Sequence, residues 1–169
     1  LADGVIDASG YRYRGIIADV LTGLDWLGGR PKVDPGRLGV AGSESGLIAA
    51  SMRAGAVKAL LMSGPMILRV ASARKSWPDS YPLEELNDFV RSHPDRATDV
   101  SRTLAFFDPI RFVSGYGGYA LVACPDWDRD VATSLVSRIG GDGELYVNTG
   151  RGAADHAFTE NWLEERLTS

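Results

Sequence analysis

A turn that holds two serines and a glutamate is the part of this 169-residue chain best suited to carry chemistry. Ser43 and Ser45 flank Glu44, and Gly42 and Gly46 close the turn on either side. A serine hydroxyl becomes a nucleophile toward acyl groups when a neighbouring base takes its proton. A sharp turn that presents such a residue needs small residues two before and two after its apex, where the strand and helix backbones converge. This spacing places Glu44, and not a hydroxyl, at the apex.

Two residue types that such chemistry uses, histidine and aspartate, also occur further along the chain. His156, one of two histidines, follows a Gly-rich stretch, and Asp128 follows an apolar run. In a catalytic triad the histidine takes the proton of the nucleophile and the carboxylate orients the imidazole ring. With Glu44 at the apex, the histidine would lie between two carboxylates, which favour its protonated form. A protonated histidine is no general base, so these three residues predict an ion cluster and not an active triad.

Other residues are candidates for binding. Trp77 and Tyr81 could line a binding pocket, or they could pack in the core. Cys124 ends an apolar run and is expected to be a small buried side chain. The aspartates around Asp128 lack the glycine and the distal glutamate of a calcium loop. We therefore expect neither a metal ion nor a cofactor.

Short apolar runs alternate with segments of helical periodicity along the chain. The runs predict strands at residues 37–42, 57–62, 119–124 and 144–148. The periodic segments predict helices at 13–27, 47–52, 83–91, 95–107, 131–139 and 158–167. Such alternation is typical of parallel βαβ units. We expect one α/β domain over residues 1–169, a mostly parallel sheet flanked by helices, with a helical insertion at 65–112 above the carboxyl edge of the sheet.

Composition excludes some classes of partner. The formal net charge is −4 and 44% of the residues are apolar, with no basic cluster, which argues against a nucleic acid or an anionic membrane surface. No apolar run is long enough to span a bilayer. No charged-then-apolar leader is visible at the start of the chain, which favours the cytoplasm slightly and leaves the compartment unassigned.

Several segments, in the correct order, resemble the acetyl xylan esterase and cephalosporin deacetylase family of α/β-hydrolases. They are residues 11–15, 19, 24–27, 33–40, 80–85, 103–109, 128–134 and 155–156. The resemblance implies a partial α/β-hydrolase fold with a nucleophile elbow at 42–46. It also implies that Asp128 and His156 stand at the acid and base positions of a triad. The reaction would remove acetyl groups from sugars or small molecules.

Two departures from the family pattern qualify this expectation. The family has serine at the apex of Gly-x-Ser-x-Gly, where Glu44 stands here, and the strained apex conformation costs a non-glycine residue roughly 1–3 kcal/mol. A shift of one residue to make Ser45 the nucleophile would place Leu47 at a crowded position. The resemblance also begins after the N-terminal half of the family fold, which implies one open sheet edge.

Three hypotheses follow from these observations. The first is an acetyl-esterase-like domain that is catalytically degenerate because Glu44 replaces the nucleophile. The second is an active deacetylase of a small acylated substrate that uses Ser45 or Ser43 with His156 and Asp128. The third is an interaction module, compatible with the first, in which a homo-oligomer or a partner chain covers the open sheet edge.

Overall fold

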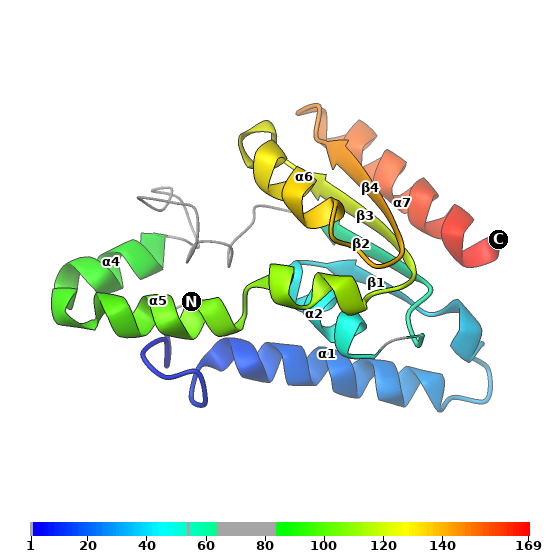
Figure 1. Cartoon of the computed structure of the whole chain (residues 1–169). Coiled ribbons are helices and arrows are strands. Elements are labelled where there is room, and N and C mark those ends of the chain that lie inside the picture. The colour runs from blue at the N-terminus through cyan, green and yellow to red at the C-terminus, as the bar shows by residue number, and fades with distance from the viewer. Residues whose placement is uncertain (1, 54, 64–83) are drawn as a thin grey trace.

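Four parallel strands form the sheet in the part of the chain that this computed structural model describes, which is residues 2–53, 55–63 and 84–169 (Figure 1). They are β1 (Gly39–Gly42), β2 (Ala59–Ser63), β3 (Tyr119–Cys124) and β4 (Asp142–Val147), and their order in the sheet follows their order in the chain. Leu60 pairs with Val40 on one side and Ala120 on the other. Parallel pairing brings all four carboxyl ends to one edge, where α/β folds place their functional groups.

The two central strands, β2 and β3, are buried on both faces, which explains why they are continuous apolar runs. Leu60 and Met62 of β2 belong to the core on one face. Leu61, between them, belongs to the core on the other face together with Trp162. The alternation follows from the two-residue period of a strand.

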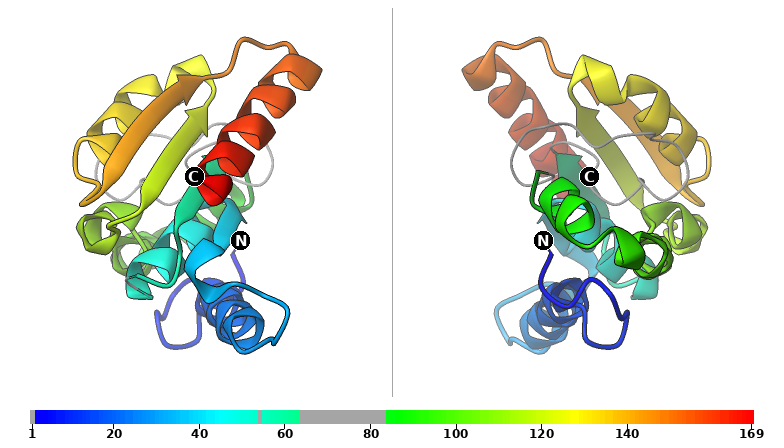
Figure 2. Two further views of the ribbon diagram at one scale, coloured as in Figure 1. Left: turned by 90° about the vertical axis from the view of Figure 1, so that its right-hand side faces the viewer. Right: turned by 90° about the vertical axis from the view of Figure 1, so that its left-hand side faces the viewer.

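Helices cover the two faces unequally (Figure 2). α2 (Glu44–Met52) and α6 (Arg129–Val136) pack on one face, and α7 (Gly152–Thr168) packs on the other against β2 and β3. α1 (Arg12–Gly28) packs against α2. None of the described helices is long and apolar enough to cross a membrane.

The described part of the insertion forms a second core, away from the strands. It contains α4 (Glu84–Ser92) and α5 (Ala97–Phe106), which extend to the left of the sheet in Figure 1. Leu86 and Leu104, both fully buried, pack with Ile17 of α1 and Ile48 of α2. The other helical turns in residues 2–53, 55–63 and 84–169 are short 3₁₀ segments at Pro35–Arg37, Pro94–Arg96, Pro109–Arg111, Val113–Gly115 and Asp126–Asp128. The insertion therefore extends the layer of α1 and α2.

Most predicted elements are present with small changes of boundary. β3 has the predicted bounds, and α1 ends at Gly28, where the Gly29 N–H donates to the Asp25 carbonyl and the Arg30 N–H to the Leu27 carbonyl. Two helices begin earlier than the sequence indicates: α2 at Glu44 instead of residue 47, and α7 at Gly152 instead of residue 158. Both early starts change the environment of a candidate catalytic residue. Trp77 and Tyr81 lie outside the described residues.

Candidate active site

The turn between β1 and α2 does not have the strained geometry that we expected of it. Ser43 precedes α2 with an extended backbone (φ −89°, ψ −169°), and Glu44 is the first residue of that helix. No non-glycine residue among those described has a positive φ. The expectation of a strained apex is therefore wrong, because an early start of α2 gives Glu44 an ordinary helical backbone. Only 1% of the Glu44 surface is exposed.

Crowding at the two glycines of the turn differs. A Cβ atom at Gly46 would lie 2.9 Å from Val40 Cγ1, so this position needs glycine. A Cβ atom at Gly42 would meet nothing within 4 Å among the described residues. The expected convergence of strand and helix is confirmed at Gly46 and is wrong at Gly42.

The two serines of the turn bond to each other. Their hydroxyl oxygens lie 3.0 Å apart, with Ser43 at the surface and Ser45 only 6% exposed. No hydrogen bond among the described residues joins either hydroxyl to His156. A serine without a hydrogen bond to a base lacks the arrangement that activates it as a nucleophile.

Two buried tyrosines lie beside Glu44, which the sequence did not indicate. Burial, aided by the negative charges of Glu85 and Glu44, raises the pKa of Tyr11 to about 12. Burial and Glu44 also raise the pKa of Tyr13, against the opposite effect of the hydroxyls of Ser45 and Ser43. Both phenols therefore stay protonated at neutral pH. The Tyr11 and Tyr13 hydroxyls have no hydrogen-bond partner among the described residues.

An aromatic cluster fixes these tyrosines at the amino end of α1. The ring of Phe107, at the end of α5, packs edge-on against both, with centroid distances of 5.4 Å to Tyr11 and 5.9 Å to Tyr13. The turn is thus backed by aromatic side chains that belong to the second core. Glu44 is part of that buried environment.

His156 lies within α7 and not in a loop, which corrects the sequence-based placement. It is the fifth residue of the helix, and its Nε2 lies 3.2 Å from Glu160 Oε1, one turn further along. The side chain of His156 is 72% exposed. The loop that follows β4 therefore consists of residues 148–151 alone. It is shorter than predicted and contains no histidine.

Asp128 follows β3 as predicted, but in a different environment from His156. It ends a 3₁₀ turn at the carboxyl end of the strand and is fully buried. The exposed carboxylate of this loop belongs to Asp126, which accepts a 3.0 Å hydrogen bond from Arg129 Nε. Burial, together with the charge of Asp128, raises the pKa of the Cys124 thiol. Cys124 is fully buried, which confirms its expected role as a small core side chain.

A cavity of about 480 Å³ opens at the carboxyl edge of the sheet on the α7 side. Its polar lining includes Gly42, Ser63, Asn148, Asp155 and His156. Of the predicted site residues, His156 alone contributes to the described lining of this cavity. Ser63, at the end of β2, is a hydroxyl that sequence reasoning missed, because a single serine after a strand has no distinguishing pattern.

Asp155 organises the loop between β4 and α7. It accepts hydrogen bonds from the Tyr146 hydroxyl at 2.7 Å, from the Thr149 N–H at 3.0 Å and from the Thr149 hydroxyl at 2.8 Å. The Thr149 N–H and the Tyr146 hydroxyl, against a small opposing effect of burial, lower the pKa of Asp155 to about 2. This clamp fixes the first turn of α7, and with it the position of His156.

A family model described as acetyl xylan esterase (AXE1) matches residues 1–129. The chain belongs to the acetyl xylan esterase family. This confirms the resemblance, and the match includes the Glu44 turn and Asp128 but ends before β4 and α7.

Two solved structures have the same α/β-hydrolase fold. An acetyl xylan esterase from Paenibacillus sp. R4 is 23% identical with a TM-score of 0.74, over 96% of this chain and 55% of that one. Acetyl xylan esterase 1 from Thermoanaerobacterium sp. JW/SL YS485 is 20% identical with a TM-score of 0.76, over 100% of this chain and 59% of that one. The chain thus spans less than three fifths of the length of either protein. The expected fold class, a parallel sheet flanked by helices, is confirmed.

In this acetyl xylan esterase family member, the candidate groups form two separate sets. One set is the buried turn, where Glu44 lies beside two phenols and the serines bond each other. The other is the open cavity, where His156 pairs with Glu160. The described residues contain no group of three or more histidine, cysteine or acidic side chains that could hold a metal ion.

Proposed function

We propose that this chain is an acetyl xylan esterase-like domain that does not hydrolyse esters through a serine nucleophile. The observation that carries the proposal is that Glu44 is buried at the head of α2, the position that the resemblance assigns to the family serine. A carboxylate is already ionised, so a histidine cannot activate it as it activates a hydroxyl. The domain would then act as a binding or structural subunit that does not cleave esters.

The state of His156 supports the same proposal. A general base must lie within hydrogen-bond reach of the proton that it takes. His156 is directed to Glu160 on its own helix and is largely exposed. The alternative is catalysis on a small acylated substrate by Ser45 or Ser43, with His156 and Asp128. It would require His156 to leave Glu160 and to contact the serine hydroxyl.

A non-catalytic role as an interaction module has its own support in the sheet. Within the described residues, β1 pairs with β2 on one side only, and Ala41 at its middle is exposed. An open strand edge offers unpaired N–H and C=O groups to another chain. We propose that a second copy or a partner chain covers this edge. Sedimentation of the purified chain over a range of micromolar concentrations tests for the second copy, and a monomer throughout would argue against it.

A fluorophosphonate probe tests the catalytic proposal, because it forms a covalent bond with an activated serine. The expected result is no labelling of the folded chain by mass spectrometry, with an active serine esterase labelled in parallel. Labelling that disappears in Ser45→Ala or in Ser43→Ala, but not in Ser63→Ala, would instead establish an activated serine and overturn the proposal. The three alanine variants differ from the parent by one hydroxyl each.

A further inference from the structure

We propose that the groove between α1, α2 and the end of α5 binds a small amphiphile with an apolar tail and a carboxylate head. The groove has a volume of about 540 Å³, within the range of small-molecule sites. It lies apart from the cavity at the carboxyl edge of the sheet and shares no lining residue with it. The lining residues that matter here are Arg14, Ile17, Leu21, Met52, Phe106 and Phe112.

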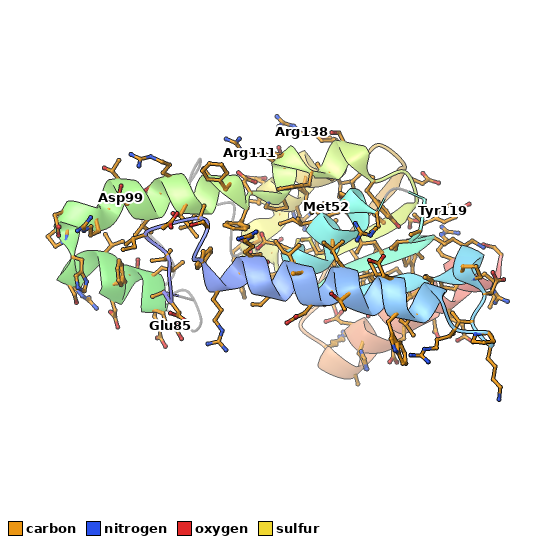
Figure 3. All side chains as sticks on the ribbon, turned by 90° about the horizontal axis from the view of Figure 1, so that it is seen from below. Met52, Glu85, Asp99, Arg111, Tyr119 and Arg138 are labelled. Atoms are coloured by element: carbon orange, nitrogen blue, oxygen red, sulfur yellow. The ribbon has the colours of Figure 1, made fainter. Side chains whose placement is uncertain are left out.

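The groove follows one stripe of α1. Arg14, Ile17 and Leu21 recur at helical spacing, so they line the same face of the helix. Seven residues of α-helix span about 10 Å, which is enough for an acyl chain of medium length. In Figure 3 the molecule is seen from below, with α1 across the front and Met52 labelled beside it.

The two ends of the groove differ in chemistry. The helices α1 and α2 run in the same direction, so their amino ends lie at one end of the groove and their carboxyl ends at the other. Tyr13 lies near Ser45 at the amino ends of these helices, and Arg53 bonds Asp25 near their carboxyl ends. Arg14 therefore marks the charged end of the groove. Met52, on the last turn of α2, belongs to the opposite, apolar end.

The apolar part of the groove is unusually open to water. Met52 is 51% exposed and Phe106 is 59% exposed. Contiguous exposed apolar surface with a polar rim is typical of binding sites. The flexible thioether of methionine adapts to ligands of different shape. Burying these side chains under an apolar tail would be favourable by about 25 cal/mol for each Å² removed from water.

The positive charge of Arg14 determines which ligand head group we expect. It is the one charged side chain among the described residues that line the groove. Its single side-chain hydrogen bond to a described residue runs from Nη1 to the Ser9 carbonyl at 3.2 Å, and no carboxylate in that part of the chain pairs with it. A guanidinium has five N–H donors in a planar fork, so it can still bind a carboxylate through two of them. This complementarity selects an anionic head over a neutral or cationic one.

Calorimetric titration with sodium decanoate and with decanol, both below the concentration at which they aggregate, tests the proposal. We expect one saturable decanoate site for each chain. Arg14→Gln should weaken decanoate binding about tenfold and leave decanol unchanged, because only the head-group contact is lost. Arg138→Gln, which removes an exposed arginine outside the groove (labelled in Figure 3), should change neither.

A variant that fills the groove provides the second measurement. Ala18 lines the groove and is exposed, so Ala18→Trp should block the site without strain in the core. We expect it to abolish binding of both ligands, with an unchanged circular dichroism spectrum. The proposal is overturned by an absence of saturable decanoate binding, by equal losses in Arg14→Gln and Arg138→Gln, or by full binding in Ala18→Trp. A dimer that dissociates in Ala18→Trp, without decanoate binding, would assign the groove to a second copy and also overturn it.

Discussion

Nε2 of His156 and Oε1 of Glu160 lie 3.2 Å apart on one face of α7, and this pair directs the histidine along the helix surface. The alternative partner at the turn after β1 is a buried glutamate that lies beside two phenols. An esterase site needs its nucleophile and its base in contact. In this chain Glu44 is buried and His156 is largely exposed, so we expect that replacing one residue alone will not assemble a triad.

Placing serine at position 44 is therefore expected to leave the chain inactive. We expect Glu44→Ser to hydrolyse p-nitrophenyl acetate at the same rate as Glu44→Ala, because the new hydroxyl has no base in contact with it. The alanine variant is the matched control, since it loses the same carboxylate and differs only by the hydroxyl. An assembled triad would increase the rate by several orders of magnitude, so such a gain in Glu44→Ser alone would contradict the separation of the two sets.

Packing between β1 and α2 is expected to depend on the absence of a side chain at position 46. A Cβ atom there would lie 2.9 Å from Val40 Cγ1, and overpacking of this kind costs about 1–3 kcal/mol. Gly46→Ala should therefore lower the free energy of unfolding in urea, although alanine favours helix. Gly23→Ala on the exposed face of α1, where nothing lies within 4 Å of the new Cβ, should raise it by up to about 1 kcal/mol.

A double-mutant cycle makes the same prediction sharper. Val40→Ala removes the atom that clashes, so the combined Val40→Ala and Gly46→Ala variant should be more stable than the sum of the single effects indicates. Additive losses would show that the cost at Gly46 arises elsewhere.

The positions of His156 and Glu44 show where sequence reasoning reaches its limit. Apolar residues at three- and four-residue steps predicted α1 almost to its ends. The first turn of α7 has no such pattern, because the buried residues of this helix, Thr159 and Trp162 among those described, lie in later turns. The Gly-rich, polar stretch before residue 158 therefore resembled a loop, and His156 was wrongly placed in that loop. The hydrogen bonds of Asp155 stabilise this turn and leave no periodic signal.

The surroundings of Glu44 were hidden for another reason. The sequence correctly predicted where the chain turns after β1, since glycines and an apolar run are local signals, although residues 44–46 belong to α2 and not to the turn. Tyr11 and Tyr13 reach Glu44 from thirty residues earlier in the chain, and they do so only because α1 packs beside α2. Contacts between elements depend on packing, which no period within one element describes.

The buried phenols predict a loss of stability at high pH. The pKa of Tyr11 is raised to about 12 in the folded chain, whereas a phenol in the unfolded chain has a pKa of about 10. Above pH 10 the unfolded state loses its proton first, so the free energy of unfolding falls as the pH rises toward 12. The slope is at most about 1.4 kcal/mol per pH unit for each such phenol.

Substituting the two tyrosines isolates their part of that alkaline loss. Tyr11→Phe and Tyr13→Phe should each flatten the decline, and the double variant should flatten it most. At pH 7 neither substitution breaks a hydrogen bond between described residues, so stability there should be unchanged or slightly higher. Urea denaturation at pH 7 and at several values between pH 9 and 11 measures both effects. A parallel decline in parent and double variant would exclude these phenols as its source.

The loop before α7 should be the acid-sensitive part of the site. Asp155 has its pKa lowered to about 2 by the Thr149 N–H and the Tyr146 hydroxyl, while an unfolded aspartate titrates near pH 3.9. The stabilisation by Asp155 is therefore present above about pH 4 and is lost as the pH falls toward 2. Asp155→Asn should lower the melting temperature at pH 7, and the difference from the parent should shrink between pH 5 and pH 3. Asp19→Asn, on the exposed face of α1, is the matched control and should melt with the parent at pH 7. A difference between Asp155→Asn and the parent that stays constant down to pH 3 would mean that the aspartate acts through packing and not through its charge.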